Sequence, residues 1–160
     1  MRRFLRMLTF LALAALAGWA SAEVTVTFAD AAAFSDMNTD NMRAADTERA
    51  ITDHLRQLGE RFLGRGELLS VRILDIDLAG NDEWLRRAPF RIRVARESTW
   101  PRLRLGYTLT RDGAVVAHGE ETIADLNYLH RLSRYDATDP YRYEKQLLDD
   151  WFGQRFAGRG

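Results

Sequence analysis

Asp112-Gly113 stands between two segments, residues 102–110 and 114–118, in which apolar and polar residues alternate. An Asp-Gly pair in this position is the strongest short-range signal for a β-hairpin, because both residues accept the positive φ of a type I′ turn. The pattern predicts two antiparallel strands with one buried face, since a register slip of one residue would bury the arginines. A two-residue turn places four pairs opposite each other: Arg111 and Ala114, Leu109 and Val116, Tyr107 and His118, and, on the solvent side, Arg104 and Glu121.

Other segments carry a regular hydrophobic period. Alternation predicts strands over residues 24–28, 68–78 and 90–94. Residues three and four apart share one face of a helix, and this spacing predicts a helix with an apolar face formed by Ile51, Leu55, Leu58 and Phe62. Asp139-Pro140 predicts the start of a last helix. The apolar face of that helix is formed by Tyr141, Leu148, Trp151, Phe152 and Phe156.

The order of the predicted elements is strand, helix, three or four strands, helix. Antiparallel strands with helices on one side are typical of α+β domains. We therefore predict an α+β two-layer sandwich, with a mainly antiparallel sheet of four to five strands and two main helices on one face. The strand over 24–28, the first helix and the strand over 68–78 are expected to form a βαβ crossover. Gly80-Asn81-Asp82 is expected to open a loop.

The first 22 residues have the pattern of a secretory signal peptide. Arg2, Arg3 and Arg6 precede the apolar segment 7–19, and Ala20-Ser21-Ala22 offers small residues for cleavage before Glu23. The alternative, a retained membrane anchor, is disfavoured because an apolar run of about 13 residues is short of the roughly 20 that span a bilayer. We expect a Sec-type leader over residues 1–22, helical and poorly packed, followed by a single domain over 23–160 in the periplasm or outside the cell.

The composition narrows the function classes. The chain contains no cysteine, which excludes disulfide bonds, thiol catalysis and cysteine-based zinc sites. The full chain carries 23 basic and 23 acidic side chains. The leader holds three arginines and no acid, so residues 23–160 carry 20 basic and 23 acidic side chains, a net charge of −3. This mildly acidic balance argues against nucleic acid as a partner.

Asp75 and Asp77 are the first candidate site residues. Alternate residues of a strand point the same way, so the two carboxylates are expected to lie together. Paired carboxylates bind a hard cation or share a proton in acid–base chemistry. The structural alternative is a strand end at which each carboxylate bonds a neighbouring arginine or a loop amide. His54, His118 and His130 lack the spacing of a metal site, and we expect no cofactor and no metal.

Arginines form the second candidate site. Arg91, Arg93, Arg102 and Arg104 alternate with apolar residues on two strands that we expect to be adjacent, and Arg72 can join them. Such a face can bind phosphate-bearing envelope lipids or other polyanions through bidentate hydrogen bonds. The structural alternative is a solvated sheet face with Arg–Glu cross-strand pairs, each of which contributes little to stability.

Several short motifs, in order, resemble a known family. They are Phe34-Ser35-Asp36, Ile76-Asp77-Leu78-Ala79-Gly80, Trp100-Pro101-Arg102-Leu103, Gly119-Glu120-Glu121, Asp125-Leu126-Asn127-Tyr128, and Arg142-Tyr143-Glu144-Lys145 followed by Leu148, Asp150, Trp151 and Phe152. The chain resembles the bacterial exported family labelled domain of unknown function 3016, over nearly all of residues 23–160. The resemblance implies an exported α+β domain, and it implies no activity, ligand or catalytic residue.

The sequence favours a non-enzymatic binding or accessory protein of the cell envelope. The expected contact surface is the arginine face with the loop over 79–89, and the expected partner is an anionic envelope lipid or an envelope protein. The alternative is a metal-dependent or acid–base hydrolase that uses Asp75 and Asp77, which requires these carboxylates to converge with a histidine in a pocket. A further alternative is a subunit that adds its edge strand to a partner's sheet.

Overall fold

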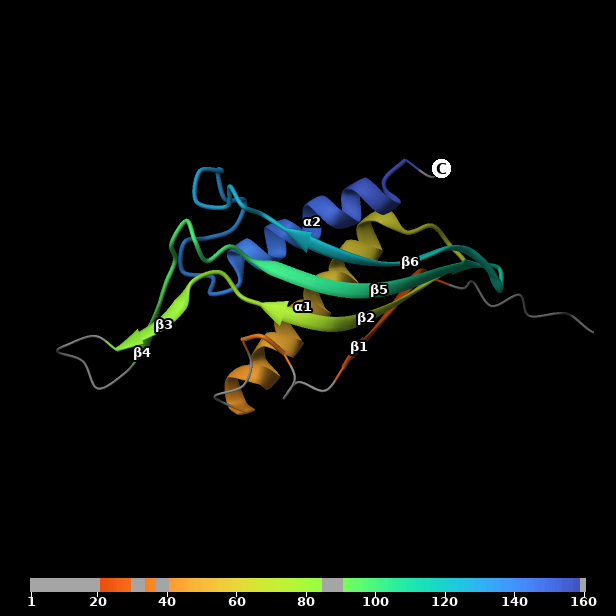
Figure 1. Ribbon diagram of the computed structural model, residues 1–160. Helices are drawn as coiled ribbons and strands as arrows, with labels where there is room; N and C mark the ends of the chain where they lie inside the picture. The colour runs from red at the N-terminus through yellow and green to blue at the C-terminus, as the bar shows by residue number, and fades with distance from the viewer. Residues whose placement is uncertain (1–20, 30–33, 37–40, 85–90, 159–160) are drawn as a thin grey trace, which may run out of the picture.

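The computed structural model describes residues 21–29, 34–36, 41–84 and 91–158 (Figure 1). Its elements, in chain order, are β1 (Glu23–Phe28), α1 (Asn41–Phe62), β2 (Glu67–Asp77), β3 (Asn81–Trp84), β4 (Arg91–Val94), β5 (Arg102–Arg111), β6 (Ala114–Ala124) and α2 (Arg142–Phe156). Of the leader helix predicted over residues 1–22, residues 1–20 lie outside the described residues, and residues 21–22 are not helical. No helix within the described ranges is both long and apolar enough to cross a membrane.

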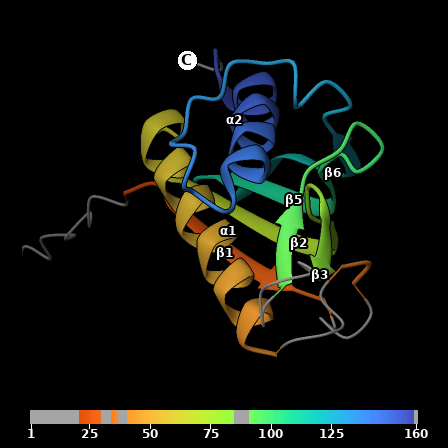
Figure 2. The same ribbon diagram turned by 90° about the vertical axis from the view of Figure 1, so that its left-hand side faces the viewer.

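The main sheet has four strands in the order β1-β2-β5-β6. β1 pairs with β2 in parallel, as the predicted βαβ unit requires, and the other neighbours are antiparallel. Both helices lie on the same side of this sheet (Figure 2). The predicted α+β two-layer sandwich is therefore confirmed, and the sheet is mixed only because of β1.

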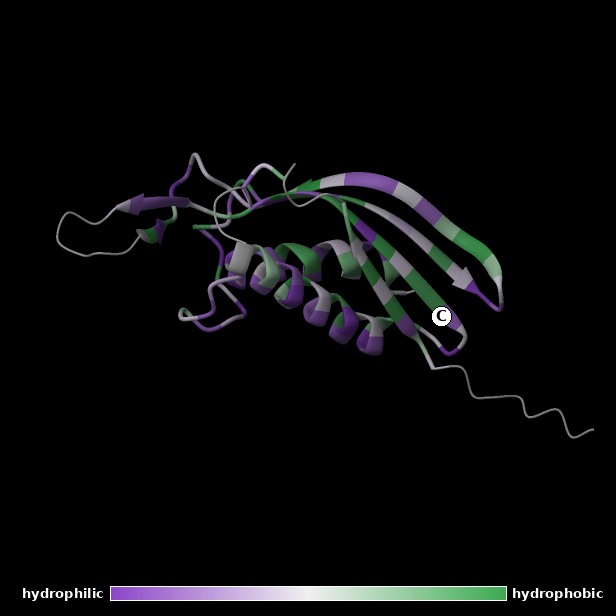
Figure 3. Ribbon diagram, turned by 90° about the horizontal axis from the view of Figure 1, so that it is seen from below, coloured by the Kyte–Doolittle hydropathy of each residue, from purple (hydrophilic) through white to green (hydrophobic). Residues whose placement is uncertain are grey.

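The core fills the space between the helices and the sheet. Ile51, Leu55 and Leu58 of α1 are at most 1% exposed, which confirms the predicted apolar face. Phe152 of α2 is fully buried and contacts Phe156 at a ring-centroid distance of 4.7 Å. Along the strands, hydrophobic and hydrophilic residues alternate (Figure 3), so each strand sends one set of side chains into this core.

The predicted hairpin forms, but its register differs from the expected one beyond the turn. Asp112 and Gly113 both have positive φ, and Arg111 pairs with Ala114 as predicted. A β-bulge at Val116 then inserts one extra residue into β6, so Leu109 pairs with Ala117 and Tyr107 with Gly119. The expected pairing of Arg104 with Glu121 is therefore wrong, because the bulge shifts the partner to Thr122. Glu121 instead faces the helix layer and bonds Arg155 at 2.9 Å.

Two other predicted boundaries change. Asn81 and Asp82, expected to open a loop, belong to β3, which pairs with β4 in a separate two-stranded sheet extending from the body (Figure 1). The strand over 90–94 is therefore not a neighbour of β5. The last helix begins at Arg142 rather than after Asp139, because the Asp139 carboxylate accepts a hydrogen bond from the Tyr141 N–H at 2.9 Å and closes a turn before the helix.

Candidate functional site

The face of the main sheet opposite the two helices is here called the open face. It is formed by alternate residues of the four strands, and no described helix lies on it. Its described residues are Glu23, Thr25, Thr27, Leu68, Ser70, Arg72, Asp75, Asp77, Arg102, Arg104, Thr108, Thr110, Val115, His118, Glu120, Thr122 and Ala124, with Gly106 near the centre. Four of the six predicted site residues therefore share one surface: Asp75, Asp77, Arg102 and Arg104.

Asp75 and Asp77 lie together, as predicted, but both carboxylates have partners. Asp75 accepts hydrogen bonds from the Ser35 N–H at 2.8 Å and the Ser35 hydroxyl at 2.9 Å. Arg102 Nη2 lies 3.2 Å from Asp77 Oδ2 and 3.9 Å from Asp75 Oδ2. This arrangement matches the structural alternative, in which the carboxylates bond an arginine and a loop amide.

No histidine bonds either carboxylate in the described part of the chain. His118 is on the open face, but the row of Gly106 and Glu120 separates it from Asp75, which lies in line with Arg104 and Thr122. His130 bonds Glu97 at 3.2 Å. His54 belongs to α1, on the other side of the sheet. No group of three or more possible metal ligands occurs among the described residues. The geometry gives the hydrolase alternative no support.

The predicted arginine face is divided between two sheets. Arg91 and Arg93 lie on β4, and Arg93 turns toward the body, where it donates to the Ala79 carbonyl at 3.0 Å and pairs with Asp36. Arg102 and Arg104 lie on the open face of β5. Arg104 is 3.6 Å from Glu120, the kind of cross-strand pair that the solvated-face alternative predicts.

An open hollow of about 650 Å³ lies around Gly106 on the open face. Gly106 has no side chain to fill the space between its two cross-strand neighbours, Arg72 on β2 and Glu120 on β6. Ser70 and Thr108, which face each other in the next row, also line the hollow. Arg72 is exposed and has no ion pair with any described residue. Among the described residues of the open face, Arg72 is thus an arginine without an ion pair.

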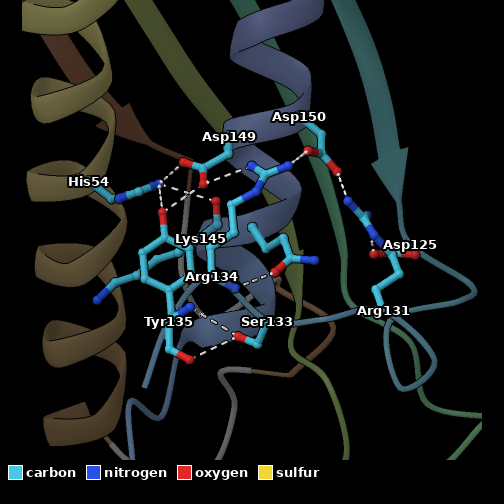
Figure 4. Close-up of polar contacts among 10 residues, drawn as sticks. His54, Asp125, Arg131, Ser133, Arg134, Tyr135, Lys145, Asp149 and Asp150 are labelled. Carbon is cyan, nitrogen blue, oxygen red and sulfur yellow. Dashed lines mark hydrogen bonds and ion pairs between the residues drawn. The ribbon is translucent and has the colours of Figure 1, made fainter. Parts of the chain in front are cut away.

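A second polar group lies on the helix side, where His54 of α1, Asp149 of α2 and Tyr135 meet (Figure 4). His54 Nε2 lies 2.9 Å from Asp149 Oδ1 and 3.1 Å from the Lys145 carbonyl. The Tyr135 hydroxyl donates to Asp149 Oδ2 at 2.8 Å. We call these three side chains the His54–Asp149 cluster. The sequence analysis did not predict this cluster, because His54 and Asp149 are 95 residues apart and no local pattern links them.

The cluster continues outward through arginines. Arg134 bonds both Asp149, at 3.2 Å, and Asp150, at 2.9 Å, and Arg131 then bridges Asp150, at 2.5 Å, to Asp125, at 2.6 Å (Figure 4). This chain of contacts ties the segment between β6 and α2 to the surface of α2. Its groups bond one another, so the network is suited to holding the two helices and this segment together.

Burial and hydrogen bonding have opposite effects on the pKa of Asp149. Burial by itself raises the pKa of the carboxyl, but hydrogen bonds from His54 and Tyr135 outweigh it and hold the pKa of Asp149 below its ordinary value. Burial, and then the bond to Asp149, raise the pKa of Tyr135. Asp149 is therefore a buried carboxylate, 9% exposed, whose charge the neighbouring donors stabilise.

Glu144 occupies a third polar site, where the β3–β4 hairpin joins the body. Its side chain is 1% exposed, and Oε1 accepts a hydrogen bond from the Ala79 N–H at 2.7 Å. Oε2 is buried without a hydrogen-bond partner. Burial raises the pKa of Glu144, and burial also lowers the pKa of the nearby Arg93, so desolvation outweighs their mutual attraction in both groups.

Replacing Glu144 with glutamine should stabilise the protein at alkaline pH. A carboxyl whose pKa is raised in the folded state favours folding fully below its unfolded pKa and loses this contribution as the pH rises through the folded value. Glutamine keeps an oxygen for the Ala79 N–H and does not ionise. We expect Glu144→Gln to gain about 1 kcal/mol over the wild type at pH 8, and to lose this gain near pH 4. Urea unfolding across this range measures it, and a pH-independent difference would contradict it.

The chain matches the model of a protein family. A family model described as "Protein of unknown function (DUF3016)" matches residues 22–154. Neither the curated proteins nor the solved structures contain a match to the chain. Several motifs that carry the resemblance meet at one end of the domain, where Ala79 bonds Glu144 and where Tyr128 and Tyr143 stack edge to face at 4.7 Å.

Proposed function

The chain belongs to the DUF3016 family, whose function is unknown, and we propose that it is an exported, non-enzymatic binding or accessory domain of the cell envelope. Its leader is cleaved between Ala22 and Glu23, and the protein works in the periplasm or outside the cell. Its contact surface is the open face, which replaces the undivided arginine face as the surface that meets the partner.

The observation that carries this proposal is the contrast between the two sides of the sheet. On the helix side, the carboxylate of Asp149 and the hydroxyl of Tyr135 have internal partners. On the open face, the strands present hydroxyls, a hollow of about 650 Å³ and an arginine, Arg72, that has no ion pair within the described part of the chain. Binding sites are concave and hold a few polar groups that converge on the ligand, and the open face has this character.

Export is tested by sequencing the N-terminus of the protein recovered from its native host. The full gene is expressed from its own promoter, and the cells are separated into cytosol, periplasm and medium. We expect the first residue to be Glu23 and the protein to be absent from the cytosol. Recovery of a cytosolic form that keeps residues 1–22 would refute the export proposal.

The contact surface is tested by photo-cross-linking in the same host. A photoreactive residue at Thr122 probes the open face, and one at Gln57, exposed on α1, is the matched control on the helix side. We expect adducts with an envelope component from position 122 and none from position 57. Adducts at position 57 alone, or equal adducts at both positions, would show that the open face is not the contact surface.

A further inference from the structure

We propose that the open face binds a single-chain anionic amphiphile, with its oxyanion at Arg72 and its hydrocarbon chain over Leu68 and Val115. The inference depends on the proposed role of the open face as the contact surface, and it adds the chemical class of the ligand.

The cationic end of the site is Arg72. Arg102 and Arg104, the other arginines of the open face, already contact the carboxylates of Asp77 and Glu120. Arg72 contacts none among the described residues, so its guanidinium is available for a bidentate contact with a phosphate or a carboxylate. The absent side chain of Gly106, directly opposite on β5, leaves room for that group.

Hydroxyl groups stand beside the cation. Ser70 and Thr108 form the cross-strand pair one row closer to the hairpin end, and both line the hollow. His118 continues this row on β6. Hydroxyls and an imidazole can donate hydrogen bonds to the remaining oxygens of an oxyanion. Glu120, the acid in the hollow, is engaged by Arg104 on its far side.

The apolar end lies one row further toward the hairpin. Leu68 and Val115 both pair with Thr110, and their side chains are 45% and 58% exposed. Leu68 precedes Arg72 by four residues on β2, a separation of about 13 Å along the strand. The open face therefore changes from apolar to hydroxylic to cationic within the length of a short amphiphile.

The same order of side chains disfavours a polyanion. A polymer of phosphates gains affinity from several uncompensated cations in a row, whereas Arg102 and Arg104 are already paired. Arg72, which has no ion pair among the described residues, and an exposed apolar pair about 13 Å away along the strand match one charged headgroup on one chain. Burial of that chain adds about 0.8 kcal/mol for each methylene removed from water.

The full-length gene product is titrated by calorimetry with dodecyl phosphate and, separately, with dodecanoate, each below its micelle concentration. These two arms distinguish a phosphate from a carboxylate headgroup. Dodecyl maltoside is the neutral control and inorganic phosphate is the control without a chain. We expect at least one anionic amphiphile to bind about a hundredfold more tightly than either control, since both charge and chain contribute.

The site is located with three variants. Arg72→Gln should weaken binding about tenfold, the effect of one charged hydrogen bond. The control is Arg102→Gln, which removes an arginine of the same face that is paired with Asp77 outside the hollow, and it should change binding less than about twofold. Gly106→Val fills the hollow. The position has room, because a Cβ at Gly106 would meet only the Gly119 carbonyl at 3.8 Å, and valine suits a strand. This variant should fold and should not bind.

Amide chemical shifts supply the second readout. Shifts confined to residues around Ser70, Arg72, Gly106 and His118 support the site. The inference is overturned by equal affinity of the wild type and Arg72→Gln, by shifts on the helix side, or by no binding of either anionic amphiphile. The cross-linking experiment separates this inference from the proposed function. If neither amphiphile binds but position 122 still forms adducts with an envelope component, the ligand class is wrong and the open-face proposal stands. If position 122 forms no adducts, the proposed contact surface is itself refuted.

Discussion

Replacing Asp149 with alanine is expected to lower the free energy of unfolding by about 3 kcal/mol, the largest loss among the substitutions considered for this domain. The carboxylate is 9% exposed and accepts hydrogen bonds from Tyr135 and His54, whose side chain is itself 6% exposed. Removing it leaves the Tyr135 hydroxyl without its best acceptor and leaves His54 with only the Lys145 carbonyl and the tyrosine oxygen. Unpaired buried donors are costly because they have already lost their water.

The control for this loss is Asp53→Ala. Asp53 is an exposed acid on α1, so its removal should change the free energy of unfolding by less than about 0.5 kcal/mol. Urea unfolding of the two variants, followed by circular dichroism, measures both values. Equal losses would mean that the His54–Asp149 cluster does not hold the helices together.

The contribution of Asp149 to the free energy of unfolding should decrease as the pH falls. A carboxyl whose pKa is lowered on folding contributes stability above its unfolded pKa, and this contribution is lost as the pH falls through the folded value. The bonds from His54 and Tyr135 lower the pKa of Asp149 despite its burial. The stability difference between the wild type and Asp149→Asn should therefore be largest near pH 7 and should narrow below about pH 4.

Two parts of the fold follow directly from local sequence patterns and were predicted correctly. The apolar spacing of Ile51, Leu55 and Leu58 defines the buried face of α1, and Asp112-Gly113 defines the hairpin turn. The bulge at Val116 was not predicted, because the alternation within one strand does not show how that strand pairs with its neighbour. The bulge shifts the pairing of β6 with β5 by one residue. β3 was missed because its sequence, Asn-Asp-Glu-Trp, is mostly polar and its strand partner, β4, begins only at Arg91.

The candidate site likewise has features that the sequence predicts and features that depend on packing. Period-two alternation predicted that Asp75 and Asp77 share a face with each other, and that Arg102 and Arg104 do so too. Both pairs lie on the open face because an irregularity of β2 between Ile73 and Asp75 turns the two carboxylates away from the side of Val71 and Ile73. Whether a charge on that surface is free depends on neighbours from other strands, which alternation does not reveal. Arg72 gains its significance from Gly106 on β5, and Asp149 from His54 on α1. Both relations arise only when the strands and helices pack.

Replacing Gly59 with alanine is the second substitution with a large expected effect on stability. Helix propensity alone predicts that it stabilises the protein, whereas the packing of α1 on β1 predicts that it destabilises it. Glycine inside a helix costs about 1 kcal/mol relative to alanine, so α1 by itself favours Gly59→Ala. In the folded domain, a Cβ at Gly59 would come closer to Val24 Cγ2 than real Cβ atoms approach a neighbour. Val24 is 6% exposed in the core of β1 and is short and branched, so it has little freedom to move away.

We therefore expect Gly59→Ala to destabilise the protein by about 1–3 kcal/mol, because overpacking at the contact between α1 and β1 exceeds the gain in helix propensity. The double variant with Val24→Ala removes the branched methyl groups that the new Cβ meets, so it should be more stable than the sum of the two single changes predicts. A double-mutant cycle by urea unfolding measures this coupling. A stabilising Gly59→Ala, or strictly additive changes, would mean that α1 can shift away from β1, and that close approach of helix to strand is not what requires glycine at this position.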